Sequence, residues 1–203
     1  MDQASDGTQS LELSSLPERH PAVGEALLHQ CGPSTIVRLS IDPTQQPPGT
    51  IYRSIEVDWI AQPANNPAVW ADRVIGWNGL DEWEVLCEQL PMVYNDHLLT
   101  ELSAIAVFSL LINDLEGGVL QTVLPIGSGG DYLVRLAGAD GEVQVEVSGI
   151  KDDPGGDRSR PRLQQKRTQV LQHVRVGHVS VTTFSYRAVA IVHSFLHYAK
   201  LDE

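Results

Sequence analysis

GSGGDYLVRLAGADGEVQVEVSGIK, residues 127–151, is the stretch that decides the fold. Its valines at 143, 145 and 147 alternate with polar residues, which is the period-two pattern of a strand with one apolar face. Residues 131–136 alternate in the same way. The intervening Asp140-Gly141 pair accepts the positive φ angles of a tight turn. We therefore expect a β-hairpin here.

Two carboxylates belong to this hairpin. Asp131 opens the first strand, and Glu146 lies on the polar side of the second strand, away from the valines. They are expected to approach each other near the open end of the hairpin. Neighbouring carboxylates repel unless a proton or a cation lies between them, so the pair is a candidate site for a hard divalent metal ion.

A long helix is expected over residues 95–114, with Asn95 or Asp96 as its N-cap and a Gly-Gly pair after it. Its apolar residues are so dense that the helix must be largely buried. Glu101 shares the face of Phe108 and Ile112, so its carboxylate points inward. A buried carboxylate must be protonated, paired with arginine or backbone donors, or bound to a shared cation.

The rest of the chain was assigned from periodicity and turn residues. The expected elements are helices over 21–33, from 81, over 160–174 and over 186–198, and strands over 35–41, 51–60, 119–126 and 178–185, with a loop over 42–50.

Length and composition predict a globular protein. A chain of 203 residues with 42% apolar residues can form one domain with an extension. We expect a disordered tail over 1–18, an N-terminal α/β extension over 19–92 that packs on the core, and a core over 93–203. The longest apolar run, 104–112, is well short of the roughly 20 residues of a membrane span. No export signal opens the chain, and Cys31 and Cys87 are expected to be buried free thiols, so the sequence predicts a cytoplasmic protein without membrane contact.

Charge is distributed unevenly along the chain. The net charge is −12, yet residues 151–187 hold 8 Lys and Arg against 3 Asp and Glu, whereas residues 1–150 hold 5 against 21. A basic segment can bind phosphate even in an acidic protein. The alternative is a solvated loop and helix face. The candidate nucleic-acid-binding residues are Lys151, Arg158, Arg160, Arg162 and Arg167.

The expected order from residue 95 is helix, three strands, helix, strand, helix. With a Glu on the first helix, an Asp on the second strand and a Glu on the third, residues 95–198 resemble the core of the PD-(D/E)XK superfamily, the restriction-endonuclease-like nucleases. The resemblance implies an α/β fold whose mixed sheet has helices on both faces, with the acidic N-terminal extension added. It also implies that Asp131 and Glu146 bind Mg²⁺ or Mn²⁺ for phosphodiester cleavage, and that Glu101 is the additional carboxylate of some members.

The chain departs from the family pattern at the lysine. The triplet reads Glu146-Val147-Ser148, so a serine occupies the lysine position. Some members carry the lysine on the following helix, which makes Lys166 the candidate catalytic lysine and Lys151 a nearer but less well directed one. Two functions follow from the resemblance: a metal-dependent nuclease, or an inactive nuclease-fold subunit that binds a protein partner or a second copy of itself in a nucleic-acid-processing or phage-defence complex.

Two further patterns have structural explanations that we prefer. His193 and His197 are four residues apart on an expected helix, a spacing that can bind zinc, but two partly buried helical histidines are the simpler interpretation. The tryptophans at 59, 70, 77 and 83 lie in the acidic part of the chain, which favours packing over stacking with bases.

Overall fold

The structure is a computed structural model of the chain. It describes residues 10–40, 51–60, 69–124, 130–137, 141–151, 158–172, 176–185 and 189–197. The expected loop over 42–50, most of the glycine-rich segment 127–130, and Asp140 of the expected turn lie outside these ranges.

The described residues form a mixed α/β protein with one eight-stranded sheet and five α-helices packed against it. The strand order is β1-β3-β2-β8-β7-β6-β5-β4. Pairs β1–β3, β2–β8 and β6–β7 are parallel, and the other neighbours are antiparallel. The strands are β1 (Ser10–Glu12), β2 (Tyr52–Ile60), β3 (Val69–Gly76), β4 (Val119–Val123), β5 (Tyr132–Arg135), β6 (Glu142–Lys151), β7 (Val176–Phe184) and β8 (Val189–His197).

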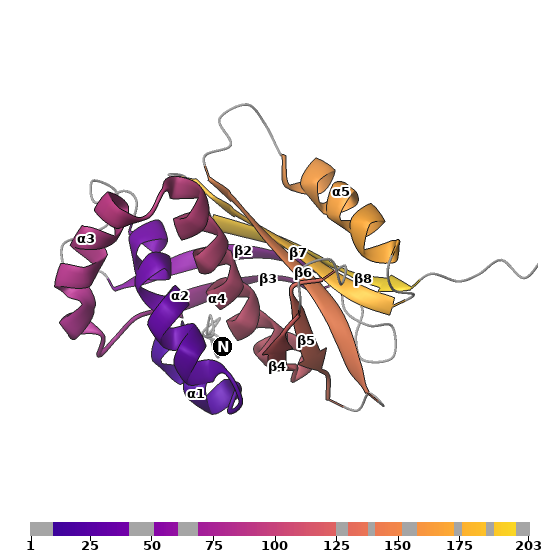
Figure 1. Ribbon diagram of the computed structural model, residues 1–203, viewed down its shortest axis with the longest axis horizontal. Helices are drawn as coiled ribbons and strands as arrows, with labels where there is room; N and C mark the ends of the chain where they lie inside the picture. The colour runs from indigo at the N-terminus through magenta and orange to yellow at the C-terminus, as the bar shows by residue number, and fades with distance from the viewer. Residues whose placement is uncertain are drawn as a thin grey trace, which may run out of the picture.

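Helices cover both faces of the sheet (Figure 1). Helix α4 packs on β6 and β7 and is itself covered by α2, whereas α5 lies on the other face against β7 and β8. The helices are α1 (Leu16–Arg19), α2 (Gly24–Leu39), α3 (Glu84–Val93), α4 (Asp96–Glu116) and α5 (Ser159–Leu171), with 3-10 turns at Leu13–Ser15 and Asp81–Trp83.

The predicted hairpin is confirmed as β5 and β6, which pair from Tyr132↔Val145 to Arg135↔Glu142. Helix α5 then connects β6 to β7, which run parallel. The described chain from α4 onward therefore follows the order α4-β4-β5-β6-α5-β7, as expected up to β7.

Helix α4 has the predicted caps, Asn95 and Gly117, and extends two residues beyond the predicted end at 114, to Glu116. The Asn95 side chain accepts a hydrogen bond from the Leu98 amide at 2.9 Å, and Gly117 ends the helix with φ of 60°. Among the described helices, α4 is the one that by length and composition could cross a membrane. However, 61% of its most apolar window is buried inside the protein, as in the core helix of a soluble protein.

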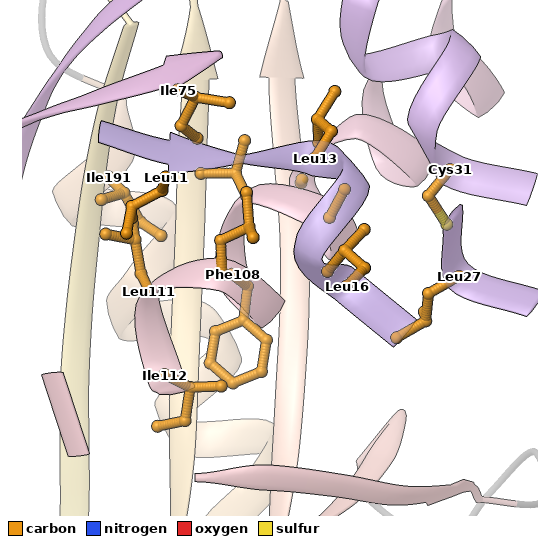
Figure 2. Close-up of a cluster of buried hydrophobic side chains, with 14 of the residues drawn as sticks. Leu11, Leu13, Leu16, Leu27, Cys31, Ile75, Phe108, Leu111, Ile112 and Ile191 are labelled. Carbon is orange, nitrogen blue, oxygen red and sulfur yellow. The ribbon is translucent and has the colours of Figure 1, made fainter. Parts of the chain in front are cut away.

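Residues 10–18 belong to the core, which corrects this part of the tail expected over 1–18; residues 1–9 lie outside the described ranges. Residues 10–18 enter β1, a 3-10 turn and α1, and Leu11, Leu13 and Leu16 are fully buried (Figure 2). Three leucines supply enough apolar area to hold this otherwise polar stretch in place. The strands from the expected extension, 19–92, and from the expected core, 93–203, join in one sheet through the β2–β8 pair.

Two element assignments were wrong. Residues 35–39, expected in a strand, continue α2, which runs through Gly32 and Pro33 because it packs along α4. Segment 186–198, expected as an apolar helix, contains β8, which lies between β2 and β7. A strand in the middle of a sheet covered on both faces is apolar throughout, and its sequence is then hard to tell from that of a buried helix.

Candidate functional site

The three predicted acids gather around the last part of β6. Strand β5 pairs with β6 as far as Val145, and beyond that point the amides of Val147 and Gly149 face the same side of the strand. The Val147 amide donates to Asp131 Oδ2 at 2.9 Å, and the Gly149 amide donates to Glu101 Oε2 at 3.1 Å. Amides two residues apart on a strand are about 7 Å apart. The carboxylates of Asp131 and Glu101 therefore follow one another along this edge.

A glycine lets Glu101 reach the strand. The first turns of α4 cross β6 so closely that a Cβ atom on Gly149 would lie 2.5 Å from the Thr100 carbonyl oxygen. Any larger residue would push the helix and its Glu101 away from the strand edge.

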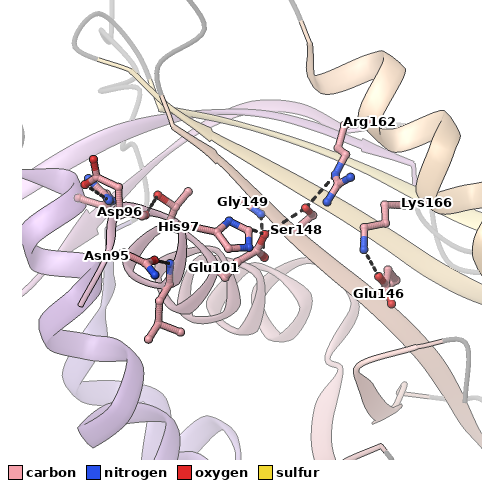
Figure 3. Close-up of polar contacts among 12 residues, drawn as sticks. Asn95, Asp96, His97, Glu101, Glu146, Ser148, Gly149, Arg162 and Lys166 are labelled. Carbon is pink, nitrogen blue, oxygen red and sulfur yellow. Dashed lines mark hydrogen bonds and ion pairs between the residues drawn. The ribbon is translucent and has the colours of Figure 1, made fainter. Parts of the chain in front are cut away.

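Glu146 points to the opposite face of the sheet from Val145 and Val147, which belong to the core. There it forms an ion pair with Lys166 of α5 (Figure 3). The pair is largely withdrawn from water, because the Glu146 and Lys166 side chains are 5% and 15% exposed. Lys166, which was predicted to replace the lysine absent at position 148, thus contacts Glu146.

Ser148, where the PD-(D/E)XK pattern has a lysine, connects the two groups of residues. Its hydroxyl accepts a hydrogen bond from Arg162 Nε at 3.2 Å and donates to Glu101 Oε1 at 3.5 Å (Figure 3). The guanidinium of Arg162 also donates to Gln165 Oε1 at 2.9 Å. A serine alone cannot supply positive charge, so charge at this point comes from α5.

Burial raises the pKa of all three carboxyl groups. For Glu101 the Gly149 amide opposes the burial effect, and for Asp131 the Val147 amide does so. For Glu146 the hydrogen bond from Lys166 lowers the pKa, while the nearby charges of Asp131 and Glu101 raise it further. Burial and the neighbouring carboxylates therefore favour either a proton or a cation on these acids.

The other predicted basic residues occupy different places. Lys151 pairs with Asp96 Oδ2 at 2.6 Å, and Arg160 pairs with Asp58 Oδ2 at 3.1 Å. Arg158 is exposed at the start of α5, and Arg167 is half-buried beside Lys166 in sequence. Of the two candidate lysines, Lys166 is the one against Glu146.

A second group of ligand-type side chains lies elsewhere in the core. Among the described residues, Glu116, His178 and His193 form the group of three whose ligand atoms all lie within 4.8 Å of one another. Glu101, Asp131 and Glu146 do not form such a group. The buried Glu116, His178 and His193 could bind a metal ion.

Sequence reasoning did not find this second group. It placed His193 on a helix with His197, but both residues belong to strand β8, so the helical spacing that can bind zinc is absent there. His178 instead comes from β7, where His178, Ser180 and Thr182 are fully buried at every second position. Polar residues at every second position of an otherwise apolar strand are the sequence pattern that could have indicated this buried polar group.

Comparisons of the chain with protein-family models, with curated proteins and with solved structures gave no match.

Proposed function

We propose that this chain is a divalent-metal-dependent, nuclease-like protein of restriction-endonuclease-like fold that acts on nucleic-acid phosphodiesters. The element order from α4 to β7 supports the fold. The positions of Glu101 on the first helix, Asp131 before the second strand and Glu146 on the third support the site.

The observation that carries the proposal is the contact between Lys166 and Glu146. A lysine is needed to stabilise the charge that develops on the phosphate, and Ser148 cannot provide it. Lys166 reaches the site from α5, two helical turns after Ser159. Its ammonium group lies on the Glu146 carboxylate and contributes to the potential at Asp131 and Glu101.

The residues fit Mg²⁺ or Mn²⁺ in their chemistry. Both ions prefer carboxylate oxygens and retain several waters, so Asp131 and Glu146 are sufficient protein ligands. Each of these side chains keeps a carboxylate oxygen that is not the acceptor in the hydrogen bonds to Val147 and Lys166. Glu101 accepts the Gly149 amide, two residues further along β6 than Val147. It completes the ligand set or adds to the negative potential at the ion. When bound, the ion supplies an activated water and stabilises charge on the phosphate.

The proposed phosphate contacts come from the basic residues on and beside α5. Arg162 is already directed at Ser148, next to the acids. Arg158, Arg160, Arg167 and Lys151 surround it in sequence and would bind the backbone without regard to base identity. Contacts of this kind steer a nucleic acid to the site despite the net charge of −12.

The test is a nuclease assay on single- and double-stranded DNA and RNA with Mg²⁺ or Mn²⁺. We expect metal-dependent cleavage that falls at least about 100-fold in Asp131→Asn, Glu146→Gln and Lys166→Met, because each removes charge from the reacting phosphate or its metal. Glu142→Gln is the matched control, since Glu142 lies on the same strand and pairs with the exposed Arg135. Cleavage by the wild type no faster than by the Asp131→Asn/Glu146→Gln double variant would exclude the enzymatic proposal.

A second candidate is an inactive nuclease-fold subunit that binds a protein partner or another copy of the chain. It is favoured by an apolar surface on α3, where Val85, Leu86, Met92 and Val93 are 62%, 40%, 84% and 73% exposed. The measurement is the mass of the protein in solution, combined with co-purification. A stable monomer with metal-dependent cleavage of its own would contradict this candidate.

A further inference from the structure

The group Glu116, His178 and His193 joins three elements in the interior. Glu116 is the last residue of α4, His178 lies on β7, and His193 lies on the neighbouring strand β8. All three are buried, with 6%, 0% and 1% exposure. They are distinct from the acids around β6, which lie near the other end of α4.

The distances suit a small metal ion. His178 Nδ1 lies 2.9 Å from His193 Nε2, and His193 Nε2 lies 3.8 Å from Glu116 Oε1. Donors at about 2.0–2.1 Å from a tetrahedral zinc ion are about 3.3 Å apart. The two distances lie on either side of this value, and all three ligand atoms lie within 4.8 Å of one another, so a rearrangement of these side chains would bring the donors around one ion.

Neighbouring groups already hold the ligands in place. The ring of Trp59 stacks on His193 with centroids 3.7 Å apart and planes 9° apart. Its indole N–H donates to Glu116 Oε1 at 2.7 Å. Packing contacts and hydrogen bonds of this kind orient the ligands in known metal sites. One tryptophan thus fixes both the imidazole and the carboxylate.

The local charge distribution also favours a cation. Glu116 ends a long helix, where the macrodipole places partial negative charge and disfavours a carboxylate. Imidazole nitrogens and a carboxylate oxygen are common ligands of divalent transition metals. A divalent ion would neutralise both the carboxylate and the helix end.

Polar atoms around the group point to the same conclusion. Within the described residues, His193 Nδ1 and the hydroxyl of Ser180 have no hydrogen-bond partner. Ser180 is the cross-strand neighbour of His193 and therefore lies on the same face of the sheet. A hydroxyl or a water beside two imidazoles and a carboxylate is a suitable fourth ligand.

We propose that Glu116, His178 and His193 form a buried structural site for one Zn²⁺ ion, with a fourth oxygen ligand beside Ser180. Two nitrogen ligands and one oxygen ligand select zinc or a related transition metal over Mg²⁺, which prefers oxygen ligands alone. The ion ties the C-terminal end of α4 to β7 and β8. Because the ligands are buried, zinc enters while the chain folds and leaves only when this part of the core opens.

The test uses the full chain without an affinity tag, refolded with Zn²⁺ or Co²⁺ and then passed through a gel-filtration column with EDTA. We expect one Zn²⁺ per chain by elemental analysis, a higher melting temperature than that of the chain refolded in EDTA, and visible Co²⁺ absorption bands of a four-coordinate site. Glu116→Gln and His193→Gln should weaken metal binding at least about 100-fold. Glu101→Gln/Asp131→Asn should retain the zinc, because these residues belong to the other site.

The Co²⁺ spectrum of the wild type decides the matter even if a core variant fails to fold. A wild-type chain that refolds with Co²⁺ and lacks these bands has no such site. Zinc that EDTA removes at once from the folded chain is bound at the surface, by exposed residues such as His29 and His97, and would also contradict the proposal. Unchanged zinc content in folded Glu116→Gln would do the same.

Discussion

A single residue determines how closely helix α4 and its Glu101 can approach strand β6. At Gly149 the backbone of α4 approaches β6 until a side chain no longer fits. This approach lets Glu101, on the next residue after Thr100, accept the Gly149 amide. Gly149, the residue directly after Ser148, is therefore part of the site, although it has no functional group.

Gly149→Ala should destabilise the protein by about 1–3 kcal/mol, because the new Cβ would overlap the Thr100 carbonyl oxygen. Urea denaturation at neutral pH measures this change. Thr100→Ser should not rescue the variant, since the nearest atom is backbone and the substitution shortens only the side chain. A full rescue would show that the contact is between side chains.

The inward direction of Glu101 and the opposite faces of Glu146 and the valines could be predicted from the sequence, because helical and strand periodicity alone determine them. The donors that these acids meet could not. The amides of Val147 and Gly149 are available only because β5 stops pairing at Val145, which depends on the turn and on the approach of α4. The group at Glu116, His178 and His193 depends on tertiary structure in the same way.

Secondary-structure elements were predictable where caps or alternation were distinct. The bounds of α4 follow from Asn95 and Gly117, and the β5–β6 hairpin follows from alternation. The strand predicted at residues 35–39 was wrong. Their β-branched side chains favour a strand locally, whereas packing of α2 on α4 extends the helix. The helix predicted where β8 lies was also wrong. A strand between two other strands and two layers of helices has no polar face, so its sequence lacks the alternation of a half-exposed strand.

Asn95→Ala should cost about 1 kcal/mol, because it removes the side-chain acceptor of the Leu98 amide at the start of α4. Asn95→Asp should retain most of the stability, since a carboxylate also accepts this hydrogen bond and suits the helix N-terminus. Thermal melts of the three proteins give the comparison. Equal melting temperatures for wild type and Asn95→Ala would mean that tertiary contacts alone hold the first turn of α4, which precedes Glu101.

At the scale of the molecule, the described residues share one sheet and one main core. The cluster of buried residues includes Leu11 and Leu13 from the N-terminal segment, Phe108 from α4 and Ile191 from β8 (Figure 2). Residues near both ends of the described chain thus share the same interior. The sequence did not predict this shared interior, because the first 18 residues contain few apolar side chains. Three of these, Leu11, Leu13 and Leu16, are nevertheless completely buried.

Leu13→Ala should lower the free energy of unfolding by about 2–5 kcal/mol, because it leaves a cavity at a fully buried position. Val85→Ala, at a position 62% exposed, is the control and should stay within about 0.5 kcal/mol of wild type. Chemical denaturation with fluorescence detection is suitable, since Trp59 and Trp83 are buried. A small effect at Leu13 would mean that the N-terminal segment is not required for the core.

In the parallel pair β2–β8, Ile55 lies opposite Val189, so the two strands are separated by most of the sequence. On the ribosome, β2 and β3 emerge long before β8 is translated, so β2 must wait with one edge uncovered until its neighbour arrives. Such a delay favours slow maturation, and an unpaired strand edge exposed during synthesis is prone to pair with other chains.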